Sequence, residues 1–233
     1  MATYYWVGGA GTWDNSSKTN WATVSGGAGG NGPPTNIDTV NFDSNSGTGT
    51  VTLTSTGTCN ACTHNAANIT VQLNANNTAF GVASAYTLSA GTLDLNNFSL
   101  NMANIASIAN AARTIAFGTT GKLIITGNNG TIINLYNATT KLTVTGTPVF
   151  DCTYSGSTGT RTINLSTTNG YRFAINAGSD TVTFGNYTLA QLDATSTITA
   201  TCTNGTTYTV GLNAGTFAGA TTTTRRMSGP SSN

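Results

Sequence analysis

The chain has 233 residues, of which 6% are charged and none is glutamate, and its formal net charge is +1. Side chains able to act as acid, base or metal ligand are therefore few, which argues against catalysis and for a structural or binding role. We expect no enzyme activity and no cofactor. No basic stretch is long enough to indicate a nucleic-acid partner. No apolar run approaches the 18 or so residues of a membrane span, so no membrane insertion is expected.

The first 45 residues form a Trp/Gly-rich block that contains all three tryptophans, Trp6, Trp13 and Trp21. Each has a large apolar surface to bury and an indole N–H that needs a partner. We therefore expect residues 1–45 to form a compact aromatic cap. No cationic leader or apolar segment begins the chain, so we expect either that a signal has been removed from this sequence or that the protein is made and used without the general export route. The second alternative suits a bacteriophage component.

The same block reads YYWVGGAGTWDNSSKTNW near its start and PPTNIDTVNFD at its end. It resembles a module that opens many phage-appendage and bacterial surface proteins with β-helical bodies. The resemblance is carried by Trp6, Trp13, Trp21, Asp38 and Asp43, which we take as structural cap residues. It implies an exposed structural protein and names no ligand.

Residues 46–178 are predicted to be the body of the fold, because short segments with period-two patterning recur about every 10 residues. Turn signals such as Asn129–Gly130 and Asn169–Gly170 separate them. Met102–Arg113 alone has helical composition, and it is either a short helix or a corner. The predicted strands are Thr39–Asp43, Val51–Thr54, Asn68–Leu73, Thr92–Leu95, Phe98–Met102, Thr114–Gly118, Lys122–Thr126, Thr131–Tyr136, Lys141–Thr145, Arg161–Leu165 and Thr181–Phe184.

The fold class is therefore all-β. Evenly spaced short strands fit either a stacked parallel β-helix or an antiparallel sandwich. In a solenoid each strand pairs with the coils above and below, so few edges need charges to protect them. The low charge favours this solenoid-like body from Thr39 to about Gly170.

Cys59 and Cys62 form a C-x-x-C pair close to His64, the only histidine. A zinc site would need a fourth ligand, such as Cys152 or Cys202, so we expect a local disulfide or two buried thiols instead. No metal or catalytic residue is assigned.

Paired carboxylates could cleave sugars if one groove held two of them, for example Asp94 and Asp151. Turn hydrogen bonding explains most of the aspartates equally well. Thr-x-Thr segments, such as Thr50–Thr52, raise ice binding as an alternative. Their irregular spacing favours the ordinary β propensity of threonine.

Residues 179–233 carry a second resemblance, to the spore coat protein U domain, the Ig-like subunit of chaperone–usher pili. The matching segments are Phe184–Tyr187, Ser196–Cys202, Asn204–Thr206, Tyr208–Gly215 and Arg225–Pro230. That domain continues beyond the RRMSGP segment, whereas this sequence ends there. The resemblance therefore implies a partial Ig-like β-sandwich segment.

These observations favour a structural virion protein of a bacteriophage: a fibre, spike or decoration subunit. The expected partners are other copies of itself or other virion proteins, and host surface polysaccharide. The alternatives are a secreted adhesin or pilus subunit at the cell surface, and a carbohydrate-cleaving tailspike.

Overall fold

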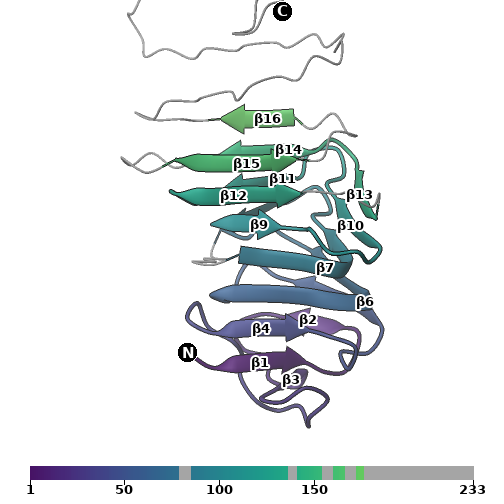
Figure 1. Ribbon diagram of the computed structural model, residues 1–233. Coiled ribbons are helices and arrows are strands. Elements are labelled where there is room, and N and C mark those ends of the chain that lie inside the picture. Colours follow the sequence, from purple (N-terminus) through teal and green to yellow (C-terminus); the bar gives the residue numbers. More distant parts are fainter. Residues whose placement is uncertain (79–84, 136–140, 154–159, 166–171, 176–233) are drawn as a thin grey trace, which may run out of the picture. The chain divides into compact units, whose positions relative to one another are not determined.

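Figure 1 shows the computed structural model of the chain, which describes residues 1–78, 85–135, 141–153, 160–165 and 172–175. These residues form sixteen β-strands and no helix, so the expectation of an all-β fold is confirmed. No helix able to span a membrane is found in this part of the chain. The described residues all belong to one compact unit, Met1–Phe184. The predicted strand Thr181–Phe184 and the proposed C-terminal segment 179–233 lie outside them.

The strands are short, apart from two long ones in the first half of the chain. They are β1 (Thr3–Trp6), β2 (Gly11–Trp13), β3 (Trp21–Ala22), β4 (Thr39–Phe42), β5 (Gly49–Leu53), β6 (Ala61–Leu73), β7 (Ala85–Asp94), β8 (Ser99–Met102), β9 (Asn104–Ala106), β10 (Arg113–Ala116), β11 (Lys122–Ile125), β12 (Gly130–Leu135), β13 (Leu142–Thr145), β14 (Val149–Cys152), β15 (Arg161–Leu165) and β16 (Arg172–Ile175).

The strands pair into three parallel ladders. Ladder 1 runs β1–β4–β6–β7–β9–β12–β15. Ladder 2 runs β2–β5–β6–β7–β10–β13. Ladder 3 runs β8–β11–β14–β16. Among the described strands, only the β1–β3 pair is antiparallel.

Strands β6 and β7 are long because each belongs to two ladders. The first part of β6 pairs with β4 and its last part with β5. The register between β6 and β7 shifts between His64 and Thr70, where both strands turn from ladder 1 into ladder 2. Gly91 makes this turn in β7 with φ +87, a backbone conformation that glycine adopts without strain.

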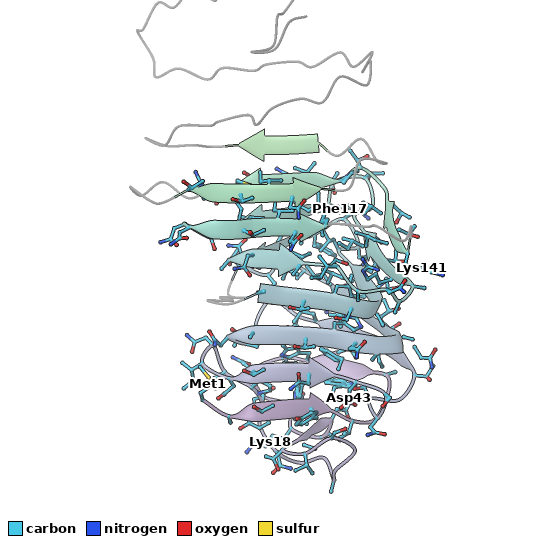
Figure 2. The ribbon with its side chains drawn as sticks, in the orientation of Figure 1. Met1, Lys18, Asp43, Phe117 and Lys141 are labelled. Atoms are coloured by element: carbon cyan, nitrogen blue, oxygen red, sulfur yellow. The ribbon has the colours of Figure 1, made fainter. Side chains whose placement is uncertain are left out.

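The core is built from side chains that alternate inward along each strand. In ladder 2, Val51, Val71, Leu93 and Ile115 lie in register on adjacent strands and are all fully buried. Burial of each such side chain stabilises the fold by about 1.5–3 kcal/mol. Phe117, labelled in Figure 2, is also buried, and its ring centroid lies 5.4 Å from that of Phe150. Neighbouring strands also form hydrogen bonds between their backbone N–H and C=O groups, so these buried polar groups are paired.

Met102–Arg113 is not a helix, so that alternative was wrong and the corner is correct. The segment contains β9 and a turn that leads into β10. Ile105 pairs with Tyr86 and Ile133 in ladder 1, and this tertiary pairing overrides the local helical composition. The corner is held by Arg113, whose Nε donates to Ser107 Oγ over 2.6 Å.

Candidate functional site

The three tryptophans predicted to form a cap lie in one cluster, positioned by β1, β2 and β3. None has any exposed surface. The rings of Trp6 and Trp21 are perpendicular with centroids 4.8 Å apart, and Trp13 lies 5.4 Å from Trp21. Phe42 from β4 packs against all three. Edge-to-face contacts of this kind add about 0.5–1.5 kcal/mol each to the stability gained by burial.

Asp38, the first of the two predicted cap aspartates, is bound by the chain's own donors. Its carboxylate accepts hydrogen bonds from the backbone N–H of Ala2 at 2.7 Å, and from the hydroxyl and N–H of Thr35 at 2.7 and 3.0 Å. Burial raises the pKa of Asp38, but these donors outweigh it and hold the pKa below its usual value. Asp38 therefore joins the chain start to the segment before β4.

Asp43, the second, closes a turn after β4. Its carboxylate accepts the N–H of Asn45 at 2.9 Å, and its own N–H donates to Ser46 Oγ at 2.9 Å. Asx turns of this type explain aspartate at strand ends without a ligand. Asp43, which directly follows β4, is labelled in Figure 2.

Cys59 and Cys62 are buried free thiols that contact each other. Burial, and then the hydrogen bond with Cys62, raise the pKa of Cys59 well above its ordinary value. A thiol of this kind is a poor nucleophile and a poor metal ligand, because both activities require the thiolate. Whether the pair becomes a disulfide stays a prediction.

His64 lies between Phe42 and Tyr86 in the core and has no exposed surface. Its Nε2 lies 3.2 Å from the carbonyl oxygen of Ile69, so Nε2 carries the proton and donates it. Nδ1, 3.0 Å from Tyr86 Oη, then accepts from the phenol. Burial lowers the pKa of His64 to about 4. Both ring nitrogens are thus occupied within the fold.

The described residues bring no three histidine, cysteine or acidic side chains together in a group that could hold a metal ion. Asp94 and Asp151, the pair considered for sugar cleavage, lie in different sheets, on β7 and β14. Asp94 instead accepts a 2.7 Å hydrogen bond from Gln72 Nε2 on the neighbouring strand. The geometry supports no acid–base pair from these two residues.

Asparagines that sequence reasoning missed connect one strand layer to the next. Asn77 is fully buried, and its Nδ2 donates to the carbonyls of Thr54 and Gly57 at 2.6 and 2.8 Å. Asn97 has φ 70 and accepts the N–H and hydroxyl of Thr119 at 2.7 and 3.0 Å. The sequence feature that could have identified these asparagines is their recurrence at turns that are separated along the chain by roughly one layer of strands.

The Spore Coat Protein U domain matches residues 138–233, a longer stretch than the 179–233 expected. This supports the C-terminal resemblance, and the matched family is a structural, pilin-like one. The N-terminal resemblance has no such support. No curated protein and no solved structure matches the chain.

Strands β13 to β16 lie within the matched residues. They pair in parallel with β10, β11, β12 and one another, so they continue the ladders begun by the preceding residues. The described strands of the matched segment therefore share the sheets of the body.

Proposed function

We propose that this chain is a non-enzymatic structural subunit exposed on a bacterial cell surface, of the pilus or adhesin kind. The observation that carries the proposal is the match of residues 138–233 to a pilin-like structural family. The buried cysteines, histidine and tryptophans support it, because each is occupied in packing or hydrogen bonding within the fold. The proposal replaces the virion protein as the favoured interpretation.

We further propose that the body is a parallel β-helix. Its support is the order in which the chain visits the ladders. From β8 onward, successive strands belong to ladder 3, ladder 1 and ladder 2 in turn: β8, β9 and β10, then β11, β12 and β13, then β14 and β15. A regular cycle of this kind is what a coil with three faces requires, and parallel strands need such crossover connections.

The proposed partners are other copies of the chain or other surface subunits. A net charge of +1 with only 6% charged residues provides little electrostatic repulsion between copies. Net charge near zero favours association.

The virion interpretation rests on the resemblance of residues 1–45, and it makes a different prediction about location. An epitope-tagged chain expressed in the bacterium that encodes it distinguishes the two. Mechanical shearing of intact cells should release the tag, and protease added outside the cells should remove it. Retention of the tag inside sheared cells, or its co-sedimentation with purified phage particles, would contradict a surface subunit.

A further inference from the structure

Five threonines lie in one file on the outer face of ladder 2. Thr50 pairs with Thr70, Thr70 with Thr92, Thr92 with Thr114 and Thr114 with Thr143. They come from five adjacent strands, β5, β6, β7, β10 and β13. We call these five residues the threonine file. The irregular spacing in the sequence had argued against such an array, yet corner segments of unequal length absorb the differences.

The threonine file faces solvent and is rigidly held. Each member alternates with an inward side chain, and Thr50 and Thr143 are exposed while the other three are half-buried. Strands in one sheet lie about 4.7–4.9 Å apart, so the file presents hydroxyl and methyl groups at that constant repeat. Threonine is stiff at χ1 because it is β-branched, which fixes the positions of both groups.

Among the outward files compared on the described strands, only this one is uniform, and its uniformity exceeds what strand propensity explains. A comparable outward file on ladder 1 is mixed: Asn41, Thr63, Thr87, Ala106 and Asn134. On ladder 3 the outward file contains Asn101, Ile124 and Asp151. If β propensity alone placed threonine, these files would be equally rich in it.

The chemistry of the threonine file selects an uncharged ligand with a regular repeat. The file itself contains no charged group, and the neighbouring outward file is mixed, with Thr52, Gln72, Asp94 and Ala116. In that file the Asp94 carboxylate is engaged by Gln72. A charged file would keep its own hydration shell, whereas threonine offers a hydroxyl to hydrogen-bond ordered water and a methyl whose burial is favourable.

We infer that the threonine file is an ice-binding surface. Ice presents water oxygens at fixed intervals, and a rigid row of threonine hydroxyl and methyl groups can hold water molecules in such an arrangement. Sugars are usually held by stacking on aromatic rings, and every outward residue of the file is threonine. This inference does not depend on the proposed surface location, because it concerns the purified chain.

The test measures how much of the full-length protein enters a slowly growing ice hemisphere. Thr92→Lys places a charge at the centre of the threonine file, and Thr70→Lys does so one strand away. The matched control is Thr87→Lys, which alters the same strand, β7, at a half-buried outward position on ladder 1. Circular dichroism and the unfolding midpoint check that each variant is folded.

Wild-type protein and Thr87→Lys should be enriched in the ice, and the two file variants should lose at least about tenfold in enrichment, the change that about 1.4 kcal/mol of lost contact free energy produces. Exclusion of the wild-type protein from ice, as for an inert protein of similar size, overturns the inference. Equal losses in Thr92→Lys and Thr87→Lys overturn it too. So does binding to cellulose or chitin powder that depends on Thr92 without entry into ice.

Discussion

The imidazole of His64 and the phenol of Tyr86 are hydrogen-bonded inside the core, with Nδ1 3.0 Å from Oη. The two residues come from neighbouring strands, β6 and β7, and neither side chain reaches solvent. Burial lowers the pKa of His64 from 6.5 to about 4, so the fold requires a neutral imidazole.

Acid should therefore destabilise the protein before its carboxylates titrate. The contribution of neutral His64 is fully present above pH 6.5 and is lost as the pH falls toward 4, because the unfolded chain takes up the proton first. Between pH 6.5 and 5 the free energy of unfolding should fall by about 2 kcal/mol. Urea unfolding across this range measures it. His64→Gln removes the only histidine and should abolish the slope, and an unchanged slope would contradict the assignment.

Gly91→Ala should be strongly destabilising. A Cβ at this position would lie 2.6 Å from His64 Nε2 and 2.7 Å from the carbonyl oxygen of Ile69, in addition to the strain of φ +87. We expect a loss of more than about 2 kcal/mol. Gly130→Ala is the matched control, since Gly130 has φ +72 but no atom within 4 Å of the added methyl. Similar losses in the two variants would show that steric contact at Gly91 is unimportant.

Trp21→Ala tests the aromatic cluster. Trp21 contacts Trp6, Trp13 and Phe42, so its removal should lower the free energy of unfolding by about 3–5 kcal/mol. Denaturant titration followed by circular dichroism gives the value. Val24→Ala, at a 62% exposed side chain in the same block, should change stability by less than about 0.5 kcal/mol. A cost below about 1 kcal/mol for Trp21→Ala would contradict a cap held together by tryptophan packing.

The buried thiols should resist alkylation in the folded protein. Burial raises the pKa of Cys59 well above its ordinary value and that of Cys152 to about 11, so few thiolates form near neutral pH. Iodoacetamide should modify both only after denaturation, as peptide mass mapping can show. Rapid labelling of Cys59 in the native state would contradict its buried position. A Cys59–Cys62 disulfide in a non-reduced digest would contradict the free thiols.

Most of the body's strands could be predicted from the sequence, because period-two alternation of β-branched residues survives in segments such as Lys122–Thr126 and Lys141–Thr145. The first part of β6, Ala61–Asn65, was missed because its alanine and asparagine residues have little β propensity. It is held as a strand by pairing with β4 and β7. The strands β1 to β3 were hidden within a glycine-rich block.

The register between distant strands could not be predicted from the sequence. Thr92 and Thr114 are brought together by the corner between β9 and β10, whose path depends on the buried contacts of Arg113 with Ser107 and Ala111. The spacing of the threonines in the sequence does not indicate the path of this corner. The threonine file was for this reason dismissed on the sequence and found in the structure.

The proposed β-helix and the threonine file both require the strands to stack in parallel ladders. The distance between Thr50 and Thr143 tests this stacking most directly. Non-cysteine spin labels at these two positions should give a distribution centred near about 19 Å, four ladder steps, measured by pulsed electron paramagnetic resonance. A distribution centred well beyond that distance, or one as broad as in denaturant, would contradict strands stacked in register from β5 to β13.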